Sequence, residues 1–218
     1  MKSEISRTKV TGGSAKATAF VGIMGALGNI LSWLSISLAP LLPEIPLGPL
    51  FSISIALDLS HLTTFIAALY GGPAIGGLTG LVGGLIAANV FGFSKGNLVT
   101  GFALPIGKAL TGVTAGFLMR ALGLQSERRH RALIVALTLL SYIPEALFTV
   151  WIFLSVLPMV FATPEMSFST WYHIFYPIVL TILTKASIEM LTEGLILAAL
   201  SMNRSFTSFI ENYFTTPP

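Results

Sequence analysis

Long apolar stretches, separated by short polar segments, make up most of this sequence. Six of them are long enough to cross the hydrocarbon core of a bilayer, which is about 30 Å thick and requires roughly 20 helical residues. They lie at residues 17–38, 51–70, 73–93, 98–122, 132–158 and 171–202. The pattern predicts an all-α integral membrane protein, a bundle of six transmembrane helices within residues 17–202, with polar tails at residues 1–16 and 203–218.

The third apolar stretch carries a small residue at every fourth position. These residues are Gly72, Gly76, Gly80, Gly84, Ala88 and Gly92. On an α-helix this spacing puts them on one face, and in lipid such a face lets another backbone approach closely. A glycine-rich phosphate loop is the other interpretation, but it requires a lysine, and no charged residue occurs between His61 and Lys95. The spacing therefore predicts a tightly packed transmembrane helix.

The composition narrows the class of protein further. Charged residues make up 10% of the chain, against roughly 25% in a soluble domain. The absence of cysteine excludes disulfides, thiolate metal ligands and a cysteine nucleophile. The chain also lacks a nucleotide-binding segment, a paired-histidine zinc motif and a nucleophile elbow. We therefore expect a protein that is not an enzyme and that holds no metal or cofactor of its own.

The basic residues are distributed unevenly, and this sets the expected orientation. Four lie in the N-terminal tail, four lie around the connection between the fourth and fifth spans, and Arg204 follows the sixth. Lys95 alone falls in a connection on the opposite side. Because basic connections stay in the cytoplasm, we expect both termini there and a multi-pass position in the plasma membrane. This placement, and not a nucleic-acid partner, accounts for the net charge of +3.

Apolar residues in the C-terminal tail recur at helical spacing. They are Phe206, Phe209, Ile210, Tyr213 and Phe214. This pattern suits a short helix that lies on the inner leaflet, although simple fraying after the sixth span fits it equally well.

Several ionisable residues lie inside the apolar stretches, where a charge costs about 2.5–3.5 kcal/mol on insertion scales. Asp58 and His61 are three residues apart and share a helix face, either as an internal hydrogen-bonded pair or as contacts for a ligand. Lys108 shares a face with small residues and is expected in the interior, where Asp58, Glu145 or an anionic ligand group would neutralise it. Glu145 follows a proline, so its alternative role is to anchor a helix kink.

Three further ionisable residues share one face of the last span. Lys185, Glu189 and Glu193 are spaced by four, so Lys185 can form an ion pair within the helix. For the two glutamates we favour a structural or partner-contacting role. Trp151 lies deeper than the other aromatic residues, which form an interfacial belt, and is expected to face a cavity. No metal site is expected at His61, because no second histidine is suitably spaced.

The chain resembles the substrate-capture subunit, or S component, of energy-coupling factor (ECF) vitamin transporters. The resemblance rests on the six-span layout, the prolines of the first outer loop and the sequence GGPAIGGLTGLVGGLIAAN at residues 71–89. It also rests on Ala15-Lys-Ala-Thr-Ala19, which is similar to the alanine-x-x-x-alanine motif of the family. Members of the family usually have an acidic residue at the outer end of the third span, where this chain has Asn89.

The resemblance implies a membrane subunit that binds a small vitamin-like solute tightly from outside. Ala15, Ala19 and Gly22 would dock onto the transmembrane T component, and two separate ATPase subunits would supply energy from ATP. We expect a pocket between the second, fourth, fifth and sixth spans. The candidate substrate-binding residues are Asp58, His61, Asn89, Lys108, Glu145, Trp151 and Lys185. Both signs of charge and nearby aromatic rings favour a planar heterocycle with an ionisable group as the solute.

Other functions fit parts of the pattern. A stand-alone secondary transporter or channel would use the intramembrane charges as a proton relay, and its uptake would depend on a proton or sodium gradient. An integral-membrane enzyme would use His61 or Glu145 as a general base and would show turnover. An assembly factor is a fourth interpretation.

Overall fold

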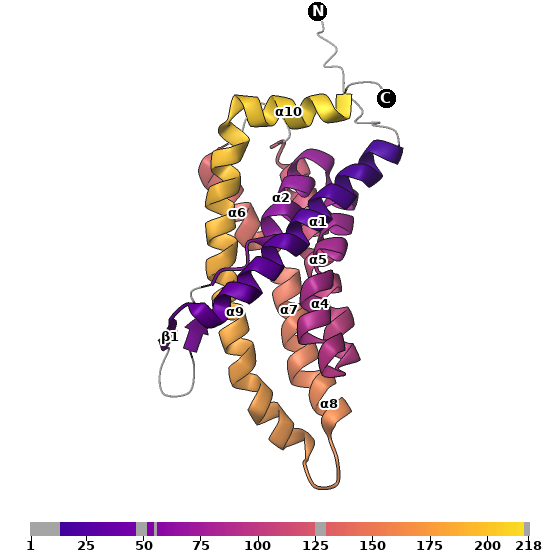
Figure 1. Cartoon of the computed structure of the whole chain (residues 1–218), viewed down its shortest axis with the longest axis vertical. Coiled ribbons are helices and arrows are strands. Elements are labelled where there is room, and N and C mark those ends of the chain that lie inside the picture. Colours follow the sequence, from indigo (N-terminus) through magenta and orange to yellow (C-terminus); the bar gives the residue numbers. More distant parts are fainter. Residues whose placement is uncertain (1–13, 47–51, 55, 125–129, 216–218) are drawn as a thin grey trace, which may run out of the picture.

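Helices that run along the bundle make up nearly all of the described structure (Figure 1). This computed structural model describes residues 14–46, 52–54, 56–124 and 130–215. Five helical segments of this part have the length and hydropathy needed to cross a membrane. They are Ala15–Leu41, Pro73–Lys95, Leu98–Ala121, Arg131–Phe161 and Phe168–Met202. The first consists of α1 (Ser14–Leu38), which crosses the bundle obliquely in Figure 1, and a 3-10 turn, η1 (Ala39–Leu41).

We expected the second span to be a helix over residues 51–70, and this prediction is wrong. Only its second half is helical, as α2 (Ser60–Gly71), whose twelve residues extend about 18 Å. Strand β2 and an irregular segment at residues 56–59 take the place of part of its first half. Ten of the twelve α2 residues are buried, so neighbouring helices surround this one. Irregular backbone at membrane depth is stable only where protein covers it, and the hydropathy of a segment does not report that condition.

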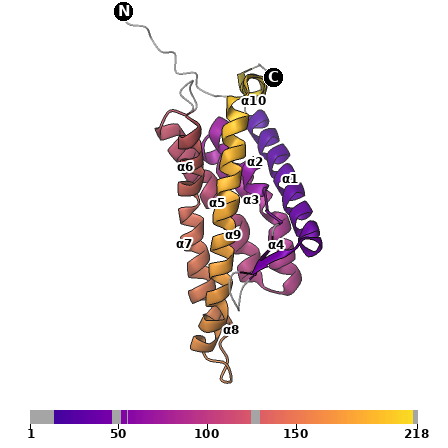
Figure 2. The ribbon, with the colours of Figure 1, turned by 90° about the vertical axis from the view of Figure 1, so that its left-hand side faces the viewer.

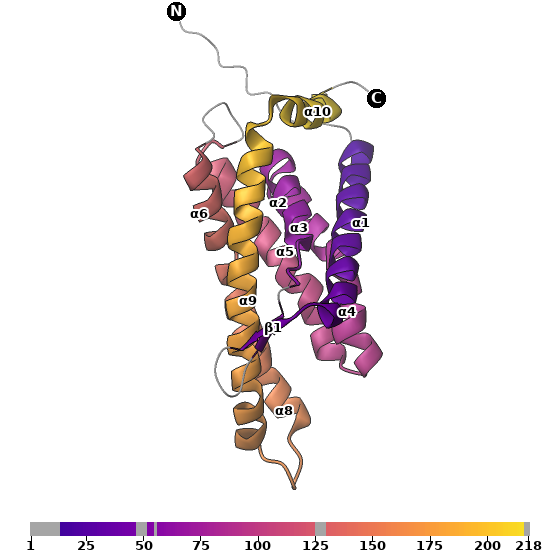
Figure 3. The ribbon, with the colours of Figure 1, turned by 60° about the vertical axis from the view of Figure 1, so that its left-hand side comes forward.

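A short antiparallel hairpin connects α1 to α2. Strands β1 (Glu44–Pro46) and β2 (Ser52–Ser54) pair so that Ile45 lies opposite Ile53. Leu42 is extended because it precedes a proline, and this ends the helical path of α1. The hairpin lies between the end of α1 and the long helix α9 (Figures 1 and 3). It thus returns the chain toward the interior of the bundle, where α2 begins.

The close packing expected from the glycine spacing is present between α3 (Pro73–Gly83) and α5 (Leu98–Ala121). A Cβ atom on Gly76 would lie 2.7 Å from the carbonyl oxygen of Gly112. The two backbones therefore meet without side chains between them, as small residues allow in lipid. Gly72 forms the turn from α2 into α3 with a φ of 84°, a conformation that favours glycine.

The expected third span is interrupted at Gly84, which separates α3 from α4 (Leu85–Phe91). The side-chain amide of Asn29, from α1, occupies the interruption. Its Nδ2 donates to the carbonyl oxygen of Val82 at 2.8 Å, and its Oδ1 accepts from the backbone N–H of Ile86 at 2.9 Å. In a continuous helix those two backbone groups would bond to each other. Asn29 is therefore inserted into the hydrogen-bond ladder and ties α1 to the interruption.

Replacing Asn29 with leucine should lower the free energy of unfolding by about 2 kcal/mol, because the Val82 carbonyl and the Ile86 N–H would lose their partner. Unfolding of the purified protein in detergent, followed by circular dichroism, measures this loss. Asn89→Leu is the matched control, since Asn89 is exposed on α4, and it should unfold like the wild type. Wild-type stability of N29L would mean that α3 and α4 close into one helix without the inserted amide.

Prolines interrupt the expected fifth span, which is helical overall but irregular. It consists of α6 (Arg131–Ser141), α7 (Ile143–Trp151), a π-helical turn η3 (Ile152–Val156) and α8 (Leu157–Phe161). Pro144 and Pro158 lie at the starts of α7 and α8, where a missing backbone N–H breaks the ladder of the preceding turn. The fifth span is therefore a series of four short helical elements in place of one continuous helix.

The last span, α9 (Phe168–Met202), has 35 residues and is about 52 Å long, so it exceeds the thickness of the hydrocarbon core. The tail after it forms the expected helix as α10 (Arg204–Thr215), which lies across one end of the bundle (Figures 1 and 2). The Phe214 ring lies 4.9 Å from the Phe20 ring on α1. The apolar face of α10 therefore packs mainly on the protein.

The start of α1 and the end of the chain meet at this end of the bundle. Lys16 Nζ donates to the carbonyl oxygen of Tyr213 at 3.3 Å, and the Tyr213 hydroxyl donates to the carbonyl oxygen of Lys16 at 3.1 Å. The turn η2 (Phe93–Lys95) follows directly after α4, at the end of α4 that points away from α10 (Figure 1). This arrangement places Lys95 far from the basic residues near α10.

Candidate functional site

Seven ionisable side chains gather in the interior of the bundle around the start of α2. We call them the charged cluster, and they come from α2, from the segment before it, and from α5, α7 and α9. They are Asp58, His61, Lys108, Glu145, Lys185, Glu189 and Glu193. Five of the seven residues proposed from the sequence belong to this cluster, and two glutamates join them.

Asp58 lies at the centre of the cluster because α2 begins inside the bundle. Its Oδ1 accepts from the backbone N–H of Ser60 at 2.9 Å, at the start of α2. A carboxylate is favourable there because the first N–H groups of a helix lack partners and carry partial positive charge. Its Oδ2 accepts from the hydroxyl of Ser32 on α1 at 3.1 Å. Asp58 thus joins α1 to the start of α2.

Lys108 reaches the same carboxylate from α5. Its Nζ lies 3.8 Å from Asp58 Oδ2 and donates to the hydroxyl of Ser60. The residue is only 5% exposed, as the small residues on its helix face led us to expect. The backbone carbonyl of Lys108 lies against Gly80 of α3. The close contact between α3 and α5 therefore determines the point at which the Lys108 side chain enters the interior.

His61 and Glu145 form a second pair beside the first. His61 Nε2 lies 3.1 Å from Glu145 Oε2, and the hydroxyl of Thr111 donates to the same oxygen at 2.5 Å. Gly107 leaves room for the glutamate, since a Cβ there would lie 3.2 Å from Glu145 Cγ. His61 Nδ1 is buried and has no hydrogen-bond partner in the described part of the chain. Glu145 is thus held by α2 and α5, and the Pro144 interruption permits that orientation.

Helix α9 contributes three residues spaced by one turn. Glu189 Oε1 accepts from the backbone N–H of Asp58 at 2.7 Å and lies 3.7 Å from Lys185 Nζ. Glu193 follows one turn later and is fully enclosed, and neither of its carboxylate oxygens has a hydrogen-bond partner among the described residues. The sequence favours a structural or partner-contacting role for both glutamates, although successive four-residue steps from Lys185 to Glu189 and Glu193 indicate that all three share one face.

Two proposed site residues lie outside the charged cluster, so their assignment to a common pocket with it is wrong. Asn89 is exposed because Ala87 and Ala88 form the inward face of α4. Trp151 is 55% exposed and has its ring 5.9 Å from that of Phe148. Position along a span does not tell which face of the helix a side chain occupies, so the sequence could not show that Trp151 points outward. Trp151 therefore belongs with the outward-facing aromatic residues.

The charged cluster contains four carboxyl groups but only two lysines and one histidine. The described residues include no group of three His, Cys, Asp or Glu side chains arranged to hold a metal ion. Glu193 lies within electrostatic range of Asp58, Lys108 and Glu189 but bonds to none of them. The arrangement offers acceptor oxygens to hydrogen-bond donors, while Lys108 and Lys185 already pair with Asp58 and Glu189.

The chain matches no protein-family profile, no curated protein and no solved structure. Its class therefore follows from its own composition and fold. Five long apolar helices around the short buried helix α2 define an α-helical integral membrane protein.

Proposed function

We propose that this protein is the substrate-capture subunit of an ECF-type importer in the plasma membrane. It would bind a small vitamin-like solute in the charged cluster, and a T component with two ATPase subunits would drive release into the cell. The observation that carries the proposal is the convergence of Asp58, Lys108, Glu145 and Glu189 within an apolar bundle. Charged groups inside a membrane protein mark sites for solutes or ions, because their insertion is unfavourable.

The exposure of the cluster supports binding from one side. The side chains of Asp58 and Lys185 are 25% and 28% exposed, whereas Glu193 is enclosed. Among the described residues, the oxygens of Glu193 and the Nδ1 of His61 have no hydrogen-bond partner, so these are the atoms that a solute reaching the enclosed part of the cluster would bond. A planar heterocycle with amino or ring N–H donors and an ionisable group has the chemistry to satisfy these atoms.

The first helix provides the surface proposed for the T component. Ala15, Ala19 and Gly22 are all exposed on α1, and a Cβ atom on Gly22 would meet nothing within 4 Å. Small exposed residues on a transmembrane helix let a second helix approach closely. Asn29 lies two turns after Gly22, at the edge of this face, where its amide bonds to the α3–α4 interruption, and Ser32 points from α1 toward Asp58.

The tagged protein should copurify with a T component and two ATPases, and mass spectrometry of the complex should identify a bound small molecule. Gly22→Leu should remove the partner subunits, because the larger side chain fills the contact, while solute binding measured by calorimetry stays unchanged. Ala121→Leu, at an exposed position at the end of α5 and away from α1, tests whether any added bulk has this effect. Purification without partners or solute under several mild detergents would contradict the proposal.

A second candidate is a secondary transporter that works alone. Two neighbouring ion pairs, Lys185–Glu189 and Lys108–Asp58, favour this alternative. Each pair could exchange a proton within the membrane, although the contact that joins them is the backbone N–H of Asp58 and not a titratable group. Accumulation of solute by the reconstituted chain alone, driven by a proton or sodium gradient, would establish this function and exclude an obligatory ATP-driven partner.

A further inference from the structure

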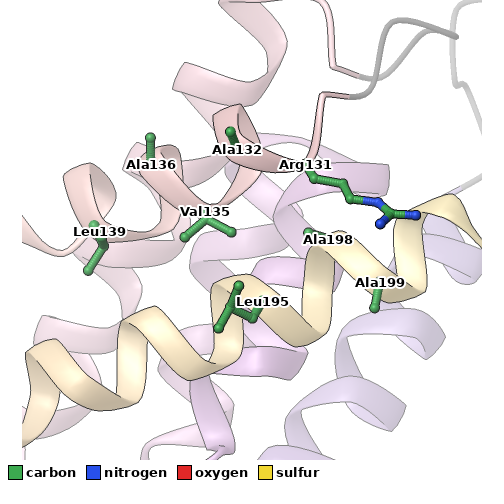
Figure 4. Close-up of a pocket in the computed structure, with 8 residues that line it drawn as sticks. All are labelled: Arg131, Ala132, Val135, Ala136, Leu139, Leu195, Ala198 and Ala199. Carbon is green, nitrogen blue, oxygen red and sulfur yellow. The ribbon is translucent and has the colours of Figure 1, made fainter.

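A groove on the surface of the bundle separates α6 from α9 and remains unused by the proposed function. It has a volume of about 680 Å³ (Figure 4). Its lining residues are Arg131, Ala132, Val135, Ala136, Leu139, Leu195, Ala198 and Ala199. Below it the helices are in close contact, since a Cβ on Gly194 would meet the Thr138 side chain. Apart from Arg131, every lining residue is apolar.

Arg131 places a positive charge at one end of this groove. It is the first residue of α6, and its side chain extends toward α9 beside Ala198 and Ala199 (Figure 4). Its Nε donates to the sulfur of Met202, at the end of α9, at 2.6 Å. A thioether is a weak acceptor, and Arg131 forms no ion pair with the residues that the structure describes. Its terminal N–H groups are therefore available to an anion.

The dimensions of the groove suit one lipid leaflet. From Arg131 to Leu139 the groove follows eight helical steps, or about 12 Å along α6. Half of the hydrocarbon core is about 15 Å thick. Arg131 lies at the end of the bundle that carries α10, which the distribution of basic residues assigns to the cytoplasm (Figure 2). A head group at Arg131 would thus belong to a lipid of the inner leaflet.

The chemistry of the groove suits a lipid. Its lining is apolar except for one positive charge at one end, which matches an acyl chain that carries an acidic head group.

We propose that the α6–α9 groove is a specific site for an anionic phospholipid, with an acyl chain in the groove and the phosphate paired with Arg131. The guanidinium group binds phosphate oxygens through two parallel N–H donors. Basic sites between transmembrane helices on the cytoplasmic side recognise acidic head groups for this reason. The site is independent of the charged cluster and of the solute proposed to bind there.

Native mass spectrometry of the full chain in mixed micelles tests this site, with phosphatidylglycerol and phosphatidylcholine of identical acyl chains as probes. The wild type should retain phosphatidylglycerol at least fivefold more than phosphatidylcholine. Arg131→Gln should reduce that ratio to about one, while Arg131→Lys restores part of it. Arg204→Gln, a basic residue at the same end, is the matched control and should leave the ratio unchanged.

A groove-filling variant tests the acyl-chain contact separately. Ala136→Leu should reduce retention of phosphatidylglycerol severalfold, whereas Ala26→Leu, exposed on α1, should not. Equal retention of the two lipids by the wild type, or wild-type ratios in R131Q, would overturn the proposal. A photo-crosslinker at position 136 should give lipid adducts, and adducts only with another protein chain would assign the groove to a protein contact instead.

Discussion

Replacing Gly76 with leucine should prevent the bundle from assembling correctly. A Cβ at this position would already lie 2.7 Å from both the Gly112 carbonyl oxygen and the Ala68 Cβ, so the larger side chain must separate α3 from α5 and α2. Overpacking in a closely packed core usually costs about 1–3 kcal/mol, and backbone contacts on two sides put this change at or above the upper limit. We expect aggregation on size-exclusion chromatography and a large loss of detergent-solubilised protein.

Two other variants test whether the expected effect comes from the close packing at Gly76 or from introducing a larger residue at any position. Gly76→Ala should give an intermediate loss of stability in denaturant unfolding, because it adds only the Cβ. Gly22→Leu should elute and unfold like the wild type, since nothing lies within 4 Å of its added Cβ. If G76L behaved like G22L, the α3–α5 backbone contact would contribute little to stability, and the glycine spacing would need another explanation.

Removing either member of the Asp58–Lys108 pair should abolish solute binding and reduce stability. Loss of one partner from a buried ion pair costs about 3–5 kcal/mol, because the other charge remains in the interior without compensation. We expect the lower end of this range for Lys108→Met, since the remaining Asp58 side chain is 25% exposed. Asp58→Asn should cost less, because an amide oxygen still accepts from the Ser60 N–H. Denaturant unfolding and calorimetry, with the solute identified in the purified complex, measure the two effects.

The double variant D58N/K108M distinguishes an ion pair that binds solute from one that only stabilises the fold. Because both charges are absent, it should recover part of the stability, with a coupling energy between about 0.5 and 3 kcal/mol. Solute binding should not recover. Lys95→Met, an exposed lysine in η2, is the control for loss of a positive charge and should bind normally. A double variant that binds solute with wild-type affinity would show that this pair is structural.

Several features of the fold could be predicted because they depend on local properties of the sequence. Membrane insertion depends on hydropathy summed over about 20 consecutive residues, which the order of the amino acids determines directly. The glycine spacing predicted the close contact of α3, and the small residues beside Lys108 predicted its interior position. The helical spacing of aromatic residues in the tail likewise indicated α10. None of these predictions required knowledge of which helices are neighbours.

The sequence predicted five of the seven members of the charged cluster but not how they pair. The signal that selected these five residues was their position inside apolar stretches; they are Asp58, His61, Lys108, Glu145 and Lys185. The sequence left open whether Lys108 would meet Asp58 or Glu145, because that choice depends on how α5 packs between α2 and α7. In the structure Lys108 pairs with Asp58, whereas Glu145 meets His61 and Thr111. Glu189 belongs to the cluster because its carboxylate accepts a hydrogen bond from the backbone N–H of Asp58. The two residues are far apart in the sequence, so the sequence did not reveal this contact.

By itself, the sequence determined an apolar helical membrane protein with charged residues in its interior, since hydropathy and residue spacing are properties of short segments. Only the tertiary structure decided that the second span is reduced to the buried helix α2 and that Asn89 and Trp151 face outward. It also decided that Asn29 occupies the interruption between α3 and α4. The physical reason is that glycine and proline interruptions free backbone groups, and residues from helices that are distant in the sequence must then cover and bond them.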